Sequence, residues 1–480
     1  MSNLFTRLFR GDPERSCIDA GDVTLTYGEL ADLAQRMATV LLDHDLASGD
    51  RIVAQTEKSI EGYALWLGCL TAGVVYVPTN TAYTPDELDY FCTDATASLL
   101  VVDDPASVAA VGCPTVALSA LVAEATAAEP AAPAEVELDT PCALVYTSGT
   151  TGRPKGATLT HGSVLDNGLA LAQVWQFDQS DVLVHSLPIF HIHGLLIALN
   201  PTLLAGASVR FLPKFDVDAV LAQLSGATVF MGVPTYYHRL LNDARFSPDA
   251  CASMRLFTSG SAPMTELTHA EFTERTGRQI VERYGMSEAG IITSNRIGDV
   301  VAGSVGHPLP GYEVRIVDDR GLVVEAGQTG VVEVRGPSLC LGYWERPDAD
   351  AESRNADGWF STGDVGHADA GGRITLEGRS SDMIISGGLN IYPKEIEMIL
   401  DEIDGVVESA VVGQPHPDFG EAVTAYLVLD DGVAIDALDL DDALIPLARF
   451  KHPKSVHQLD ELPRNAMGKV QKVLLRQSKS

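Results

Sequence analysis

Residues 144–156 read LVYTSGTTGRPKG: the apolar end of a strand, a run of hydroxyl and glycine residues, and then a lysine. Glycine lets the backbone turn and bring its N–H groups close to a ligand, and the Ser and Thr hydroxyls add donors. The glycine spacing is shorter than in a Walker A loop, which needs G-x-x-x-x-G-K-[ST]. The segment predicts a phosphate-binding loop of another kind, with a solvated surface turn as the alternative. The residues that would form it are Thr147, Ser148, Gly149, Thr150, Thr151, Gly152 and Lys155.

Strand and helix patterns alternate along the chain before this loop. Apolar runs of strand length are followed by segments whose apolar residues recur at helical spacing. This alternation indicates an α/β fold with parallel sheets. The expected strands are residues 23–27, 51–55, 74–78 and 99–103, the expected helices are residues 28–45 and 59–72, and residues 120–138 are expected to form a surface helix and loop.

The second half of the chain has a different sequence pattern. From about residue 311 it is rich in short strands separated by glycine turns, and from residue 382 it reads as a small α+β unit. Helices are expected in that unit at 394–402 and 435–448. We therefore predict a large N-terminal domain, residues 1–379, that combines parallel-type α/β sheets with a β-rich subdomain. Residues 380–480 are predicted to form a small α+β C-terminal domain.

The chain is strongly acidic. Its 480 residues include 33 Lys and Arg against 65 Asp and Glu, which gives a formal net charge of −32 at pH 7. Binding to nucleic acid needs a local excess of basic residues, so that function is disfavoured, as is attraction to an anionic membrane surface. Any anionic substrate must therefore bind to local cationic groups against an unfavourable overall field.

The seven cysteines are scattered, and the sequence contains no C-x-x-C pair or His/Cys cluster that suggests a metal site. This usage is typical of a reduced cytosolic protein. The N-terminus has no apolar core long enough for a signal peptide, and no run of about 18 apolar residues occurs in the chain. We therefore expect a cytoplasmic protein without a membrane span that acts on small molecules.

Further motifs follow the loop. They are SLPIFHIHG at 186–194, SGSAP at 259–263, ERYGMSE at 282–288, STGD at 361–364, GRSSDMIISGGLNIYPKEIE at 378–397 and PRNAMGK at 463–469. Together with TSGTTGRPKG, this set resembles the adenylate-forming superfamily, which includes acyl-coenzyme A synthetases, luciferases and the adenylation domains of peptide synthetases. The resemblance covers essentially the whole chain. It implies an enzyme that converts a carboxylic acid and ATP to an acyl-adenylate and then transfers the acyl group to a thiol.

The resemblance also implies roles for residues of the nucleotide site. Ser287 is expected to hydrogen-bond the α-phosphate, Glu288 to bind Mg²⁺, and Asp364 and Arg379 to hold the ribose. Adenine is expected to stack on Tyr284. The other residues implied to bind ATP here are Gly260, Ser261, Ala262, Pro263, Glu282, Gly285 and Met286.

Other residues are implied to act on the acid or on the thiol. Lys469 resembles the lysine that a mobile C-terminal domain brings to the site for adenylation, where it bridges carboxylate and α-phosphate oxygens. His191 is implied to abut the reacting carboxylate and to gate the site, and His193 to line the acyl pocket. The loop that accepts the pantetheine arm of coenzyme A consists of Ser386, Gly387, Gly388 and Leu389.

Within the superfamily the chain resembles the malonyl-coenzyme A synthetases. Relatives that take uncharged acids often have Gly where this chain has Arg283, and a buried cation is costly unless it is paired. A second carboxylate on the substrate would supply that pair, with Arg239 assisting. The alternatives are a structural ion pair for Arg283 and a helix-surface position for Arg239. The stretches that carry the resemblance are AQTEKS at 54–59, NTAYTPDELDYF at 80–91, FLPKFD at 211–216, GVPTYYHRLL at 232–241 and ERYGMSE.

The sequence leaves the identity of the carboxylic acid substrate open. Ala289 and Gly290 replace the Thr and Asn that are usual in malonyl-type relatives, which predicts a larger acyl pocket and makes methylmalonate a candidate beside malonate. The alternatives are a short- or medium-chain fatty or aryl acyl-coenzyme A ligase and a stand-alone adenylation enzyme that loads a carrier protein. The expected ligands are ATP, Mg²⁺, the acid and coenzyme A, and the expected assembly is a monomer or homodimer.

Overall fold

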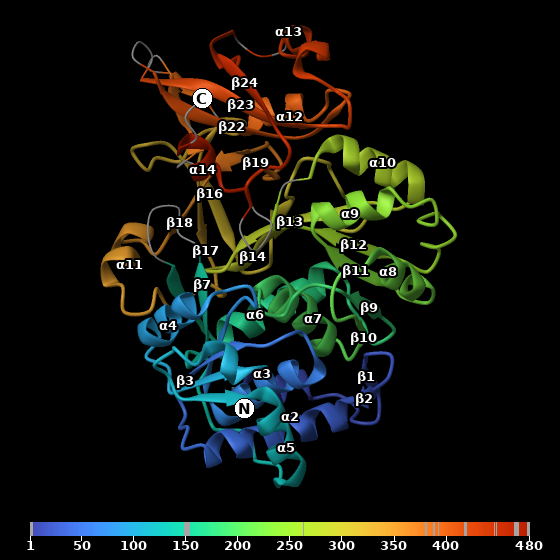
Figure 1. Ribbon diagram of the computed structural model, residues 1–480, viewed down its shortest axis with the longest axis vertical. Helices are drawn as coiled ribbons and strands as arrows, with labels where there is room; N and C mark the ends of the chain where they lie inside the picture. The colour runs from blue at the N-terminus through green and yellow to red at the C-terminus, as the bar shows by residue number, and fades with distance from the viewer. Residues whose placement is uncertain are drawn as a thin grey trace.

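The computed structural model describes residues 3–147, 154–262, 264–379, 382–386, 389–391, 393–416, 420–445, 447, 449–464 and 470–477. Figure 1 shows the N-terminal segments (blue) at one end of the molecule and the C-terminal segments (orange to red) at the other. Among the described residues, no helix is long and apolar enough to cross a membrane.

The first half of the chain forms a six-stranded sheet in the order β6-β5-β3-β4-β7-β8. The strands are β3 (Arg51–Gln55), β4 (Val75–Pro78), β5 (Leu99–Val102), β6 (Thr115–Ala117), β7 (Pro141–Thr147) and β8 (Lys155–Thr160). All are parallel except β8, which returns antiparallel to β7. Because Thr147 pairs with Lys155, the two ends of the predicted phosphate loop lie side by side at the carboxyl end of β7.

A second, nine-stranded sheet has the order β15-β14-β13-β12-β11-β9-β10-β1-β2. Its strands are β1 (Ser16–Asp19), β2 (Thr24–Thr26), β9 (Val182–His185), β10 (Ser208–Phe211), β11 (Val229–Gly232), β12 (Leu256–Ser259), β13 (Ile280–Met286), β14 (Gly290–Ser294) and β15 (His307–Pro308). The six strands from β13 to β1 are mutually parallel. Ligands of α/β sheets bind beyond the carboxyl ends of such strands, where the motifs 186–194 and 259–263 begin.

Helices connect and cover these sheets. They are α1 (Leu4–Leu8), α2 (Tyr27–Asp43), α3 (Ile60–Ala72), α4 (Pro85–Asp94), α5 (Leu118–Ala127), α6 (His161–Val174), α7 (Leu199–Leu204), α8 (Val217–Leu224), α9 (Pro234–Leu241), α10 (Glu266–Thr276) and α11 (Pro347–Ser353). Helix α3 is apolar on every side and is buried except at Glu61, as a central helix must be. The largest apolar core lies around it and extends over both sheets. The α/β fold expected from the sequence is confirmed.

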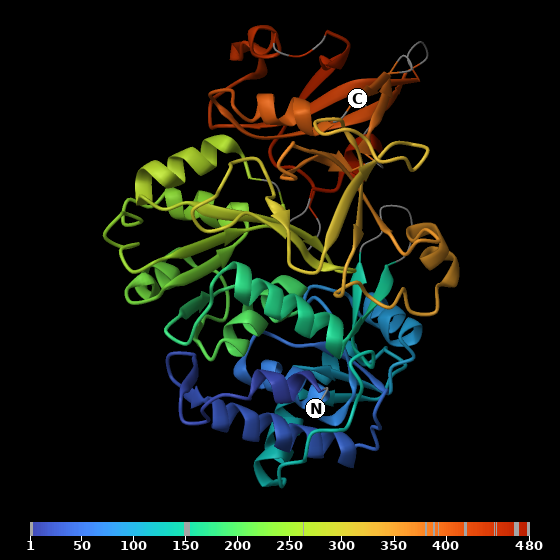
Figure 2. The same cartoon turned by 180° about the vertical axis from the view of Figure 1, so that it is seen from behind.

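The β-rich segment forms an antiparallel sheet of β16 (Glu313–Val317), β17 (Gly330–Arg335), β18 (Phe360–Ala368) and β19 (Ile374–Arg379). The C-terminal unit is a five-stranded sheet with its own apolar core. Its elements are β20 (Ile384–Ser386), β21 (Leu389–Ile391), α12 (Pro393–Leu400), β22 (Val406–His416), β23 (Gly420–Leu429), α13 (Leu440–Ala443), β24 (Ser455–Leu459) and α14 (Lys472–Gln477). Figure 2 shows this unit from behind, above the yellow and orange strands of the β-rich segment.

The helix predicted over residues 435–448 is wrong for most of its described length. The structure has only a 3₁₀ turn at Ile435–Ala437 and the four-residue helix α13. Four aspartates fall between residues 436 and 442. Aspartate side chains compete for backbone N–H groups, and that of Asp439 accepts the N–H of Asp442. The spacing of apolar residues alone therefore predicted a longer helix than the structure has.

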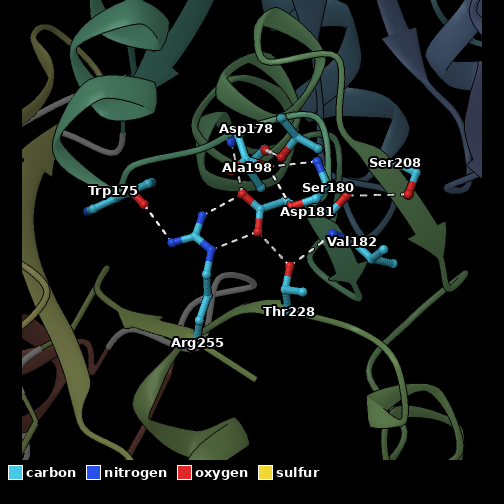
Figure 3. Close-up of polar contacts among 10 residues, drawn as sticks. Trp175, Asp178, Ser180, Asp181, Val182, Ala198, Ser208, Thr228 and Arg255 are labelled. Carbon is cyan, nitrogen blue, oxygen red and sulfur yellow. Dashed lines mark hydrogen bonds and ion pairs between the residues drawn. The ribbon is translucent and has the colours of Figure 1, made fainter. Parts of the chain in front are cut away.

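Asp181 joins the amino ends of β9, β11 and β12, at the edge opposite to the motif-bearing loops (Figure 3). Its carboxylate accepts Nε and Nη2 of Arg255 at 2.7 and 2.5 Å and the hydroxyl of Thr228 at 2.7 Å. Arg255 also donates to the carbonyl of Trp175, which caps α6, at 2.8 Å. Only 2% of the Asp181 side chain is exposed. This network fixes the sheet from the side that carries no predicted site residue.

Candidate active site

Tyr284, Asp364 and Arg379 meet although they come from three different strands. Tyr284 on β13 donates its hydroxyl to Oδ2 of Asp364 on β18 at 2.5 Å. Arg379, the last residue of β19, lies with its Nε 2.6 Å from Oδ1 of the same carboxylate. Asp364 and Tyr284 are 6% and 8% exposed. Burial, followed by the charge of Asp364, raises the pKa of Tyr284 well above its usual value, so its hydroxyl stays protonated and can donate.

Glu288 lies beyond this cluster, on the connection from β13 to β14. It is 5% exposed, and its Oε1 accepts the hydroxyl of Tyr343 at 2.9 Å. Burial raises the pKa of this carboxyl. The Lys155 ammonium lies 5.4 Å from the centroid of the Tyr343 ring. Tyr343 therefore connects the lysine at the exit of the phosphate loop with the predicted metal-binding carboxylate.

Arg283 is a buried cation with free donors. It is 6% exposed, and within the described residues its Nε and Nη2 have no hydrogen-bond partner. Nor does any described carboxylate form an ion pair with it, so the structural ion pair considered as its alternative role is not observed. Its guanidinium lies against Gly260, where an added β-carbon would be 2.4 Å from Cζ. Burial lowers the pKa of Arg283 to about 10, so the group remains charged at neutral pH.

His191 and His193 lie beside this cation. The backbone N–H of His193 donates to Nδ1 of His191 at 3.1 Å, and Nδ1 of His193 is 3.3 Å from the hydroxyl of Ser261. Burial, followed by the charge of Arg283, lowers the pKa of His191 to about 4 and holds that of His193 well below its usual range. Both imidazoles are neutral at pH 7, so Arg283 carries the only charge of this group.

Glu282 precedes Arg283 on β13 and ties together two loops. It is 7% exposed, and its carboxylate accepts the backbone N–H of Gly303 at 3.1 Å and that of Met264. Burial raises its pKa from 4.5 to about 7. The loop of residues 259–264, which contains Gly260, Ser261 and Ala262, is thus held to β13 from behind. Gly285 and Met286 complete β13 beside these contacts.

Residues 5–344 match the family described as AMP-binding enzyme, and residues 395–469 match the AMP-binding enzyme C-terminal domain. The chain belongs to the AMP-binding enzyme family. The crystal structure of ATP-bound MatB from Rhodopseudomonas palustris superposes with a TM-score of 0.95 at 46% identity, over 99% of this chain and 98% of that one. Indoleacetate–CoA ligase of Aromatoleum aromaticum is 35% identical over 97% of this chain and 95% of its own, and malonate–CoA ligase of Arabidopsis thaliana is 33% identical over 97% and 86%.

Several predicted residues of this AMP-binding enzyme lie outside the described part of the chain. They are Ser148, Gly149, Thr150, Thr151, Gly152, Pro263, Gly387, Gly388 and Lys469. Their roles stay predictions. Of the predicted thiol loop, the described residues are Ser386, which is 8% exposed, and Leu389, which pairs with it between β20 and β21.

Arg239 on α9 is exposed, which matches the helix-surface position considered as its alternative, and its role at the acid stays a prediction. The space expected at Gly290 is largely filled: the cavity lined by Gly290, Ser287 and Asn167 has a volume of about 20 Å³, enough for one water molecule. An added β-carbon at Gly290 would be 2.7 Å from the amide of Asn167, which bonds the backbone of Ile291.

Tyr343 is a site residue that sequence reasoning missed in this AMP-binding enzyme. It lies in the segment Gly342-Tyr343-Trp344, which carries no acid, base or phosphate-binding pattern. The neighbouring Trp344 N–H donates to the carbonyl of Gly156 at 2.8 Å, so the segment runs along β8. This pairing and the hydrogen bond from the Cys340 N–H to the carbonyl of Glu288, at 2.6 Å, join distant parts of the chain and bring the phenol to Glu288.

Proposed function

We propose that this protein is an AMP-forming acid–thiol ligase that joins malonate, or methylmalonate, to coenzyme A. In the first half-reaction the carboxylate oxygen attacks the α-phosphate of ATP and pyrophosphate leaves. In the second, the thiolate sulfur attacks the carbonyl carbon of the acyl-adenylate and AMP leaves. Such chemistry depends on positioning and charge neutralisation more than on covalent help from the protein. Family membership and the similarity to MatB and to malonate–CoA ligase support this proposal.

The observation that carries the choice of acid is the buried guanidinium of Arg283. Two of its nitrogens have no partner among the described residues, and a desolvated charge without a partner is unfavourable. An Arg fork can bind a carboxylate with two charged hydrogen bonds. The second carboxylate of malonate would accept hydrogen bonds from these two nitrogens, whereas a monocarboxylic acid would leave them without a partner. The exposed Arg239 is proposed to act only when the acid is bound.

The nucleotide is proposed to lie between the phosphate loop and the Asp364 cluster. Asp364 would accept the ribose hydroxyls, with Arg379 beside it, and adenine would stack on Tyr284. Ser287 is half-buried near this position and would reach the α-phosphate. Lys155 would neutralise charge on the outer phosphates, because a compact ammonium suits that role.

Glu288 fits a single-carboxylate Mg²⁺ site. No group of three or more His, Cys, Asp or Glu side chains suited to a metal occurs among the described residues. Mg²⁺ typically takes one or two carboxylates and completes its coordination with substrate phosphates and water. Bound there, it would neutralise charge on the phosphates. The raised pKa of Glu288 would fall when a divalent cation lies beside it.

The C-terminal unit is proposed to be a mobile domain of residues 380–480. It would bring Lys469 to the site for adenylation, and would then present the loop of residues 386–389 to the pantetheine arm. The assembly as a monomer or homodimer and the cytoplasmic location stay predictions.

The proposal is tested by pyrophosphate exchange and thioester formation with a panel of acids. We expect AMP and pyrophosphate as products, and a preference for malonate and methylmalonate over acetate, butyrate, hexanoate and aryl acids. Release of ADP and orthophosphate would refute the reaction class. Preference for an aryl or fatty acid would refute the role of Arg283 and favour the general acyl ligase. Acyl transfer to a purified carrier protein but not to free coenzyme A would identify the carrier-loading enzyme.

A further inference from the structure

Two cysteines from different parts of the chain meet beside the six-stranded sheet. Cys92 lies in the last turn of α4 and is 5% exposed, and Cys113 lies in the connection that leads into β6. Cys92 belongs to the apolar cluster that also contains Leu88 and Leu100, and Cys113 packs against that cluster. Six of the seven cysteines are buried, whereas Cys113 is partly exposed. A reagent in solution can therefore reach one member of the pair.

Hydrogen bonds on both sides hold the two cysteines together. The carboxylate of Asp89, which precedes Cys92 by three residues on the same face of α4, accepts the N–H of Gly112 at 2.9 Å. The Cys113 thiol donates to the carbonyl of Ala97 at 3.5 Å, and the N–H of Ala97 donates to the carbonyl of Cys92 at 2.8 Å. The segment that carries Cys113 is thus fixed along the end of α4 by contacts other than the one between the two sulfurs.

The two thiols differ in acidity. A hydrogen bond from the Cys92 thiol lowers the pKa of Cys113, although burial opposes this effect. The same hydrogen bond, followed by burial, raises the pKa of Cys92. The thiolate is the nucleophilic form of cysteine, so the partly exposed Cys113 is the member suited to react with an electrophile. The protonated Cys92 lies where a second, resolving thiol is needed.

Helix α4 also contacts the exit of the predicted phosphate loop. Tyr90, two residues before Cys92, donates its hydroxyl to the carbonyl of Pro154 at 2.7 Å. Asp94, two residues after Cys92, accepts the hydroxyl of Tyr146 on β7 at 2.8 Å. Cys92 therefore lies between two side chains through which α4 contacts β7 and the residue that follows the loop.

We propose that Cys92 and Cys113 form a modification site at which hydrogen peroxide produces a reversible disulfide. The Cys113 thiolate attacks one peroxide oxygen and the O–O bond breaks, which gives a sulfenic acid and a hydroxide that takes up a proton to become water. The Cys92 sulfur then attacks the sulfenic sulfur, the S–O bond breaks, and the thiol proton leaves with the hydroxyl group as a second water. The two sulfurs lose two electrons, which reduce the peroxide. A dithiol reverses the bond by exchange, so the disulfide is transient in a reducing compartment.

The disulfide would draw α4 toward an anchored part of the sheet. The carbonyl of Pro114 accepts the N–H of Leu100 at 2.7 Å, and β6 pairs with β5 directly after it. An S–S bond is shorter than any contact between two thiols, so its formation moves the end of α4 toward this segment. Tyr90 and Asp94 move with the helix. We therefore expect the oxidised protein to use ATP less well, a consequence that rests on the proposed place of the nucleotide at the phosphate loop.

The site is tested first by a measurement that needs no activity. Wild-type protein is treated with hydrogen peroxide, its remaining thiols are alkylated, and it is cleaved by a protease specific for aspartate. Asp94, Asp103 and Asp104 lie between the two cysteines, so the two cysteine peptides stay together only if a disulfide joins them. We expect a linked pair that has lost two hydrogen atoms and that dithiothreitol separates. Its absence, or a sulfinic acid at Cys113 in its place, would overturn the assignment.

The second measurement is pyrophosphate exchange with ATP and malonate before and after oxidation. Oxidation should lower kcat/KM for ATP by roughly tenfold or more, because a displacement of about 1 Å can cost 10²-fold, and dithiothreitol should restore it. Cys92→Ser and Cys113→Ser should each keep the activity of the reduced protein and lose the response to peroxide. Because Cys113 is partly exposed, its variant keeps the test valid if the buried Cys92→Ser variant is unstable.

The matched control is Cys251→Ser, which removes a thiol buried in a different apolar cluster. This variant should respond to peroxide as the wild type does. A loss of activity on oxidation that persists in Cys92→Ser and Cys113→Ser would place the sensitive group elsewhere and overturn the coupling to the phosphate loop.

Failure of the inference and failure of the proposed function have different signatures. If the linked peptides form but kcat/KM for ATP does not change, the disulfide exists and its coupling to the phosphate loop is refuted. If the reduced wild-type protein shows no exchange with malonate, methylmalonate or any other acid, the proposed function fails. The peptide measurement still decides the modification site in that case.

Discussion

The guanidinium of Arg283 lies flat against the backbone of Gly260, so that a β-carbon at residue 260 would be 2.4 Å from its Cζ and 2.5 Å from Nη1. Contacts below 3.0 Å force a neighbour to move. The absence of a side chain at Gly260 therefore determines where the cation stands, and the histidines beside it are neutral. Arg283 therefore places one localised positive charge at the position proposed for the acid.

Gly260→Ala should displace the guanidinium and lower kcat/KM for malonate by about 10²-fold, since a misplacement of about 1 Å can cost that much. The KM for ATP should change less. Steady-state kinetics with varied acid and varied ATP separate the two effects. Gly11→Ala is the matched control, because an added β-carbon at Gly11 meets nothing within 4 Å. Normal malonate kinetics in Gly260→Ala would show that the position of Arg283 is not critical.

Arg283→Met should lower malonate turnover by roughly 10²-fold or more, because two charged hydrogen bonds are lost. Turnover of butyrate should fall far less. Arg283→Lys should not restore turnover of malonate, since an ammonium cannot reproduce the planar fork of the guanidinium. The same Met variant should be at least as heat-stable as the wild type, because an unpaired buried charge is removed. A large fall in melting temperature would instead indicate a structural ion pair.

Asp364→Asn should raise the KM for ATP at least tenfold while the KM for the acid changes little. The substitution removes the charge that Tyr284 and Arg379 share, and a hydrogen bond to a charged group contributes roughly 1.5–3 kcal/mol. Tyr284→Phe keeps the ring and the carboxylate but removes one donor, so its effect should be smaller. A rise in the KM for the acid that exceeds the rise for ATP would place Asp364 outside the ribose site.

Glu282→Gln should change how stability depends on pH. Burial raises the pKa of Glu282 in the folded protein from 4.5 to about 7. The protonated form is favoured in the folded state, so its contribution to stability is full below pH 4.5 and is lost as the pH rises through 7. Urea unfolding of both proteins between pH 4.5 and 8 gives the difference in the free energy of unfolding. A difference independent of pH would mean that Glu282 is not buried as described.

Asp181→Asn should destabilise the fold by roughly 3 kcal/mol without affecting the KM for any substrate. Burial by itself raises the pKa of Asp181, but hydrogen bonds from Arg255, the Asp178 N–H and Thr228 outweigh it and the pKa lies below its usual value. The stabilisation is therefore present above about pH 4 and is lost as the pH falls through the lowered pKa. Denaturation at pH 7 and at lower pH measures it. A changed KM for ATP would contradict a purely structural role.

The grouping of the described residues of the candidate nucleotide site was predictable because the motifs that contain them are local in sequence. Each of its motifs contains, within a few residues, the glycines, hydroxyls or charged groups that the ligand needs, and Tyr284, Asp364 and Arg379 are brought together as expected. The parallel sheets followed from the alternation of apolar runs for a similar reason. Tyr343 could not be found in this way, because a phenol reaches Glu288 only through the pairing of distant segments.

Other differences arise from packing that no single segment encodes. The space at Gly290 looks open when residues 282–290 are read alone, but Asn167 from α6 fills it. The exposure of Arg239 depends on which face of α9 covers the apolar core under β11 and β12.

The contact between Gly260 and Arg283 also constrains the order in which this enzyme could acquire a new acid specificity. While Arg283 is present, a β-carbon at residue 260 requires its guanidinium to move. Once residue 283 becomes small, the space above residue 260 opens, and a side chain there can reshape the pocket for an uncharged acid. Under the proposed role of Arg283, a mutational path toward neutral substrates that changes residue 283 before residue 260 avoids this collision. In the reverse direction, glycine at residue 260 leaves room for the arginine to return.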